Sequence, residues 1–192
     1  RYNILNNEIT VKLNCDIKEI CQILKSIGFQ CVEHYLLDDT YYIPNTIDIK
    51  KLTEREILKN AIILRDVTGY MEKYKITKLT YKKKEIDEQG KIIKQGKVEC
   101  SISNKEEGSN FLKAINYFEI MNIKEIDTIF KKDGLEIDVK DVVNGDKLIE
   151  IEECEKFDTI DKIKQEMERL NLPVDTNDYF IKKAEVELKK VL

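Results

Sequence analysis

The alternation of polar and apolar side chains along the chain predicts a protein built mainly from β-strands. Residues 8–13 alternate at every second position, which is the period of a strand with one buried face. Further segments are rich in β-branched and aromatic residues and end at turn residues, and both features favour strands. These segments are residues 29–42, 61–65, 74–84 and 91–103, with a turn at 87–90.

Two hairpins are predicted farther along the chain. The dipeptide Asp133-Gly134 lies between candidate strands over 119–131 and 134–142. Asn144-Gly145 leads from the second of these strands into another over 147–153. Asp-Gly and Asn-Gly favour the two-residue turns that join antiparallel strands, so we expect each strand here to pair with the next.

Helices are predicted between and after the strands. Asp16 is a candidate N-cap and Gly28 a candidate C-cap for a helix over 17–27. Asn104 is a candidate N-cap for a second helix over 105–117. The remaining segments predict a loop with a short helical turn over 45–60, an amphipathic helix over 159–170 and a final helix over 178–191.

The two halves of the chain repeat the same order of strand, polar cap, helix and strand. Corresponding residues are offset by 88 positions, as in Asp16 and Asn104 or Asp39 and Asp127. Such a repeat predicts a pseudo-twofold β fold, and about eight antiparallel strands are enough to close a barrel. We therefore expect one α+β domain over residues 1–192, built on a closed eight-stranded antiparallel β barrel.

The composition limits the classes of partner and the compartment that we expect for this protein. Charged residues make up 36% of the chain, and 33 basic side chains nearly balance 37 acidic ones. Nucleic-acid binding usually needs a basic domain, so we expect no nucleic-acid partner. The five cysteines are dispersed and form no CxxC pair, which indicates free thiols in a reducing compartment. No apolar run approaches a membrane span and no signal peptide is visible, so we expect a cytoplasmic protein without a membrane partner.

Several familiar kinds of site are excluded. His34 is the single histidine, so histidine-based zinc sites and Ser-His-Asp triads have almost nothing to build with. No glycine-rich phosphate loop is present either. A phosphate site in this chain must therefore use cationic side chains.

Charge at every second position marks several strands, and it allows two interpretations. These strands could expose one face of a half-open sheet to solvent. Alternatively, they could line a polar barrel interior, where lysines hold phosphate oxygens and carboxylates hold a metal ion. The positions are residues 8, 10 and 12, residues 97, 99 and 101, and residues 150 and 152.

Together with other segments, these positions resemble the CYTH superfamily, the triphosphate tunnel metalloenzymes. That superfamily includes class IV adenylate cyclases, thiamine triphosphatases and inorganic triphosphatases. The similar segments are residues 8–12 (the family's ExExK), 39–42 (DTYY), 61–65 (ALRIR), 79–82 (LTYK), 97–99 (RxE), 124–126 (KxR), 150–152 (ExE) and Tyr179 in the closing helix. The chain departs from the pattern at Thr10, which replaces a glutamate, and at Ile63 and Ile126, which replace arginines.

The resemblance implies a closed eight-stranded antiparallel tunnel with helices packed outside. It implies that phosphates bind Lys12, Arg65, Lys82, Lys97 and Lys124. It implies a site for Mg²⁺ or Mn²⁺ at Glu8, Glu99, Asp138, Glu150 and Glu152, with Asp141 as the alternative to Asp138. It implies catalytic roles for Glu8, Lys12 and Lys82.

The implied activity is attack on a small-molecule triphosphate. Hydrolysis of tripolyphosphate or an organic triphosphate is the preferred hypothesis, because no base-recognition pocket is visible in the sequence. The alternatives are a class IV-type adenylate cyclase and a non-catalytic binder of polyphosphate or nucleotides. The sequence leaves the oligomeric state open, with a homodimer among the alternatives.

Overall fold

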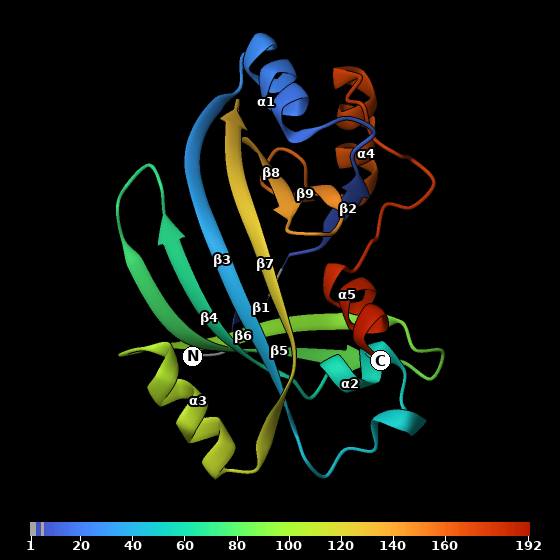
Figure 1. The fold of residues 1–192 in the computed structure, drawn as a ribbon. Coiled ribbons are helices and arrows are strands. Elements are labelled where there is room, and N and C mark those ends of the chain that lie inside the picture. The colour runs from blue at the N-terminus through green and yellow to red at the C-terminus, as the bar shows by residue number, and fades with distance from the viewer. Residues whose placement is uncertain (1–2, 5) are drawn as a thin grey trace.

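One antiparallel sheet, curled into a half-barrel, organises the molecule (Figure 1). The structure is a computed structural model that describes the backbone of residues 3–4 and all of residues 6–192. The strands are β1 (Asn3–Ile4), β2 (Glu8–Lys12), β3 (Gln30–Pro44), β4 (Ile62–Gly69), β5 (Lys75–Ile86), β6 (Ile92–Ile102), β7 (Tyr117–Lys132), β8 (Leu135–Val142) and β9 (Lys147–Glu152). The helices are α1 (Ile17–Ser26), the 3-10 turn η1 (Ile49–Lys51), α2 (Glu54–Leu58), α3 (Lys105–Ala114), α4 (Ile160–Leu170) and α5 (Lys183–Val191).

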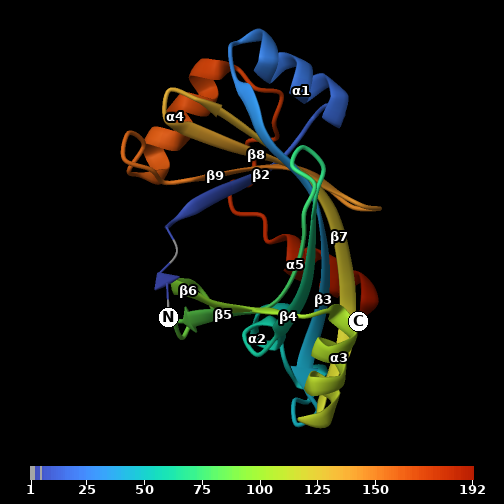
Figure 2. The ribbon, with the colours of Figure 1, turned by 90° about the vertical axis from the view of Figure 1, so that its left-hand side faces the viewer.

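The strand order confirms the predicted pseudo-twofold arrangement. The sheet runs β1-β6-β5-β4-β3-β7-β8-β9-β2, with the long β3–β7 pair at its centre. The unit β2-α1-β3-β4-β5 on one side of this pair corresponds to β6-α3-β7-β8-β9 on the other. Figure 2 shows the resulting curl, with β2, β8 and β9 forming one arm, β5 and β6 the other, and β3 and β7 the wall between them.

The expected closure of the barrel by a continuous ladder is not found among the described residues. Among the described residues, β6 pairs with β5 and β1, and β2 pairs with β9. The two outermost strands, β1 and β2, follow one another in the sequence. The sheet of the described residues is therefore a half-barrel with these two strands at its edges (Figure 2).

The other edge of β2 is covered by the segment that leads into α5. The backbone N–H of Thr10 donates to the carbonyl of Tyr179 at 2.8 Å, and the N–H of Ile181 donates to the carbonyl of Thr10 at 3.2 Å. These bonds satisfy an edge that would otherwise be open to another chain. They also explain why α5 starts at Lys183 and not at residue 178 as predicted.

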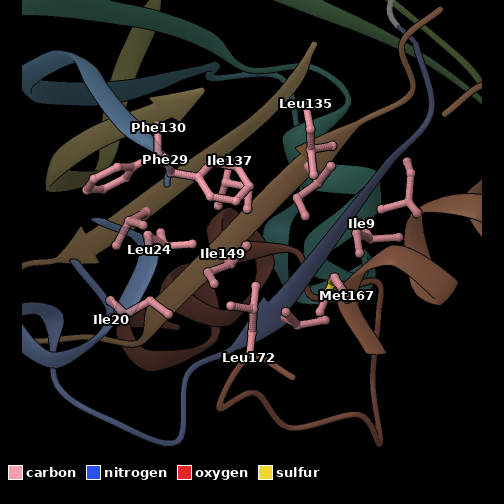
Figure 3. Packing of buried hydrophobic residues seen from close by; sticks show 14 residues of the cluster. Ile9, Ile20, Leu24, Phe29, Phe130, Leu135, Ile137, Ile149, Met167 and Leu172 are labelled. Atoms are coloured by element: carbon pink, nitrogen blue, oxygen red, sulfur yellow. The ribbon is translucent and has the colours of Figure 1, made fainter. Parts of the chain in front are cut away.

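The outer face of the arm formed by β2, β8 and β9 is largely apolar because these strands alternate. Ile9 on β2, Ile137 on β8 and Ile149 on β9 are fully buried and point away from the concave face. Figure 3 shows them packed with Ile20 of α1 and Met167 of α4, which cover this arm. A smaller cluster lies on the outer face of the other arm, where α3 packs Leu112 on Leu64 and Tyr42. The predicted helices outside the barrel are confirmed for α1, α3 and α4.

A third cluster lies on the concave side and fills one end of the half-barrel. Leu188 of α5 and Ile57 of α2 pack there against inward-facing strand residues such as Tyr41 and Ile63. Ile63, which stands where the resembling family has an arginine, is 4% exposed. Its replacement of a cation is explained by this apolar packing.

Three further points concern the end of one helix, the cysteines and the character of the helices. The helix predicted over 105–117 ends at Ala114 because Asn116 adopts a left-handed conformation with φ 64°. All five cysteines are free thiols. In the described part of the chain, none of the helices has the length and apolar character needed to span a bilayer.

Candidate active site

The concave face of the half-barrel contains a cavity of about 880 Å³. Nine basic and eleven acidic side chains line it, together with a few apolar and neutral polar residues. The strands that carry charge at every second position therefore line an interior in this structure, because Glu8, Thr10, Lys97, Glu150 and Glu152 all face the cavity. The solvent-face interpretation is wrong for these five residues.

Three carboxylates meet on the arm formed by β2 and β9. Antiparallel pairing places Glu8 opposite Glu152, and Glu150 lies two residues away on the same face. One oxygen from each of the three lies within 4.8 Å of the others. Burial, and then the charge of Glu150, raises the pKa of Glu8 to about 7, and burial also raises the pKa of Glu152. These crowded oxygens fit a hard divalent cation, since Mg²⁺ and Mn²⁺ prefer carboxylate ligands and would offset the repulsion.

Cations gather on the opposite arm. Lys82 on β5 lies directly across from Lys97 on β6, and both line the cavity with Arg65 of β4. Lys82 has no ion-pair partner among the described residues. Burial, and then the charges of Arg65 and Lys183, lowers the pKa of Lys82 to about 8. A buried cation without a counter-ion is costly, so this position favours an anionic ligand.

Arg65 is held in place by a neighbouring carboxylate. Its Nε and Nη2 donate to the two carboxylate oxygens of Asp39 at 2.6 and 2.7 Å. Asp39 is 1% exposed, and this bidentate contact fixes the plane of the guanidinium. Arg65 therefore presents its remaining donor edge in a fixed orientation.

A second network surrounds Lys140 of β8, where the acidic arm meets the wall strand β7. The Lys140 ammonium lies 3.4 Å from Asp138, 3.6 Å from Asp127 and from Glu150, and 4.0 Å from Glu125. Lys183, at the start of α5, donates to Glu125 at 2.6 Å. Burial opposes ionisation of Glu125, yet Lys183 and Lys140 hold the pKa of Glu125 at about 2.

Comparisons with known proteins agree on one relationship. No protein-family model matches the chain. A Methanocaldococcus jannaschii protein named as a candidate adenylate cyclase is 25% identical over 188 residues, which cover 95% of this chain and 98% of that protein. The solved PH1819 protein of Pyrococcus horikoshii has a TM-score of 0.68 at 18% identity and covers 99% of both chains. A Hippeastrum protein, described as a candidate adenylyl cyclase with a dominant triphosphatase activity, has a TM-score of 0.58 at 13% identity and covers 97% of both chains.

The comparisons support a CYTH-like superfamily assignment. The strand order and register account for the placement of the predicted site residues. Those that the structure brings together in the cavity are Glu8, Arg65, Lys82, Lys97, Asp138, Glu150 and Glu152. Asp138 and not Asp141 faces the cavity, because Asp141 is on the opposite face and pairs with Lys147.

Three predicted residues lie elsewhere, and each has a physical reason. Lys12 sits at the end of β2, where its half-exposed side chain pairs with Asp146 at 3.6 Å. Lys124 is exposed on the outer face of β7, because the inward positions of that strand are Glu125 and Asp127. The same alternation turns Ile126 outward. Glu99 does not line the cavity, and its carboxylate lies 3.5 Å from Lys78 and 3.8 Å from Lys97.

The prediction from sequence also missed several residues that face the cavity. Glu125 and Asp127 are separated by one apolar residue on β7, and Lys140 follows an apolar residue on β8. This alternation is a signal that these residues face inward, provided that the register of β7 and β8 is known. Lys183 carried no such signal. It reaches the cavity only because the segment before it pairs with the edge of β2.

Proposed function

We propose that this protein binds a triphosphate-containing substrate together with Mg²⁺ or Mn²⁺ in the half-barrel cavity and hydrolyses it. One observation carries the proposal: Glu8, Glu150 and Glu152 converge on one arm of a cavity whose other arm presents Lys82 beside Lys97. Within the described part of the chain, Lys82 has no counter-ion. A metal–triphosphate complex has the two matching charges.

The basic and the acidic lining residues have different roles in this proposal. Lys82 and Lys97 bind phosphate oxygens as point charges, and Arg65, oriented by Asp39, adds a planar donor. Glu8, Glu150 and Glu152 hold the metal ion, which when bound neutralises phosphate oxygens and stabilises charge on the transferring group. The apolar cluster under α2 and α5 closes one end of the cavity, which limits the access of bulk water.

Charge also explains why the proposal requires a metal. The cavity lining contains more acidic than basic side chains. A triphosphate carries about four negative charges, and an anion placed in such a lining without a cation would be strongly repelled. We therefore expect substrate binding to depend on the divalent ion and not only turnover.

A second candidate is formation of a cyclic nucleotide. It is favoured by the name of the Methanocaldococcus jannaschii relative, an adenylate cyclase candidate. The first candidate is favoured by the triphosphatase activity in the description of the Hippeastrum protein. Both reactions place a triphosphate in the same position, and they differ in whether water or a ribose hydroxyl attacks.

The test measures phosphate release and cyclic AMP formation in parallel. Tripolyphosphate, ATP and thiamine triphosphate are supplied with Mg²⁺, with Mn²⁺ or with a chelator, and calorimetry measures binding under the same conditions. We expect metal-dependent phosphate release from at least one substrate. Cyclic AMP as the main product from ATP would favour the cyclase instead, and the absence of triphosphate binding with either metal would refute both.

A further inference from the structure

Lys140 occupies an unusual position for a lysine. Its side chain is 12% exposed, and its ammonium lies within 4.0 Å of four carboxylates from β7, β8 and β9. The lysine ammonium therefore sits at the centre of an oxygen-rich cage.

The cage offers more acceptors than its cations can satisfy. An ammonium has three N–H donors, and here it faces four carboxylates. Among the described residues, one oxygen each of Glu125, Asp127 and Asp138 is buried without a hydrogen-bond partner. Glu125 and Asp127 are 1% and 0% exposed, and both face the cavity. Buried oxygens left over in this way are what a divalent cation, with six or more oxygen ligands, would use.

We propose that the Lys140 ammonium occupies a second cation position of the cavity, so that the protein takes up one divalent ion and not two. The single ion belongs to Glu8, Glu150 and Glu152, and in this respect the inference rests on the proposed function. Removing the ammonium while leaving its space open creates a second divalent-ion site formed by Glu125, Asp127, Asp138 and Glu150.

The experiment counts bound Mn²⁺ ions per protein molecule by equilibrium dialysis and by the electron spin resonance signal of free Mn²⁺. The wild type is expected to bind one ion. Lys140→Ser, which removes the charge and empties the space, is expected to bind two. Lys140→Met removes the charge but fills the space with an apolar chain, and Lys140→Arg retains a cation, so both matched controls are expected to bind one.

A further variant locates the gained ion. Asp127→Asn in the Lys140→Ser background removes a cage carboxylate without touching Glu8, Glu150 or Glu152, and it is expected to return the count from two to one. If Lys140→Ser fails to fold alone because its carboxylates repel one another, we expect millimolar Mn²⁺ to restore its circular dichroism spectrum. Failure of Mn²⁺ to do so would contradict the proposal.

Other outcomes separate this inference from the proposed function. Two ions bound to the wild type would overturn the inference about Lys140, and so would one ion bound to folded Lys140→Ser. If the wild type binds no ion and Lys140→Ser binds one, the metal site at Glu8, Glu150 and Glu152 fails while the role of Lys140 stands.

Discussion

The two halves of the sheet share an architecture and differ in charge. In both halves a central strand carries an aspartate opposite a cation on the next strand, Asp39 with Arg65 and Asp127 with Lys140. The next strand pairs with this cation, and four residues after the pairing position it carries a charged residue that lies opposite a like-charged residue of the edge strand. In one half these facing residues are Lys82 and Lys97, and in the other they are Glu152 and Glu8.

This difference shows how one repeated scaffold builds a site with two kinds of ligand. The pseudo-twofold topology fixes where the inward positions lie, and the choice of side chain then decides their chemistry. Lysines on one arm favour an anion, and glutamates at the corresponding place on the other arm favour a cation. A metal–triphosphate complex bridges the two arms because it offers both charges at a short separation.

The largest expected effect comes from removing the charge of the acidic arm. The double variant Glu8→Gln with Glu152→Gln keeps the size of both side chains but removes two of three anionic ligands, so metal-dependent phosphate release should fall to background. Release assays with Mg²⁺ and with Mn²⁺ measure it. Glu155→Gln, an exposed residue a few positions away, is the control and should behave like the wild type. Full activity in the double variant would mean that the arms do not differ in function.

The pairs of aspartate and cation that both halves share should matter for folding. Asp39→Asn leaves the buried Arg65 guanidinium without its counter-ion, and we expect the free energy of unfolding to drop by about 3–5 kcal/mol. Urea denaturation monitored by circular dichroism measures the change. Asp38→Asn is the matched control, because Asp38 pairs with Lys105 on the outer face and should cost about 1 kcal/mol or less. Equal losses in the two variants would show that the inward pair has no special structural role.

On the basic arm, substitution should affect substrate affinity more than folding. Lys82→Ala removes the buried ammonium that has no counter-ion among the described residues, and the affinity for metal–tripolyphosphate should fall about 10- to 100-fold. Calorimetry measures the affinity. Lys83→Ala is the control, since the next residue on β5 points to the opposite face. If Lys82→Ala binds tripolyphosphate as tightly as the wild type, phosphates do not use this arm.

The sequence predicted the secondary structure and the repeat well, because alternation, caps and Gly-containing turns are local signals. The inward orientation of Glu8, Lys82, Lys97 and Glu150 followed from that alternation and from the resemblance to a known family. Register along β7 was not predictable in the same way. Lys124 and Glu125 are adjacent charged residues, and a shift of one position exchanges the face on which each lies.

Other parts of the site depended on contacts between distant segments. Lys183 reaches the cavity only because residues 175–181 pair with β2, and no periodicity near residue 183 indicates this pairing. Ile63 was predicted as a lost cation, but its position in an apolar cluster with α2 and α5 became visible only in three dimensions. Long-range packing, and not local propensity, determines where the side chains of these two residues lie.

The smallest expected effect is the pH dependence of binding. It tests whether Lys82 of the basic arm binds phosphate as an ammonium. Burial and neighbouring cations hold the pKa of Lys82 at about 8. The ammonium form binds phosphate, so this group contributes fully to affinity below its pKa and loses its contribution as the pH rises through that value. Above about pH 8, affinity for metal–tripolyphosphate should fall by up to tenfold per pH unit until the pKa of the bound state is reached.

A bound anion also stabilises the ammonium and raises the pKa of Lys82, so binding near pH 8 should take up protons. Calorimetry in buffers with different ionisation enthalpies measures that uptake directly. Lys82→Arg is the matched control, because a guanidinium stays protonated over this range. The variant should bind with nearly constant affinity where the wild type weakens. A wild type whose affinity does not change with alkaline pH, or a Lys82→Arg variant that weakens equally, would place the anion on cations other than Lys82.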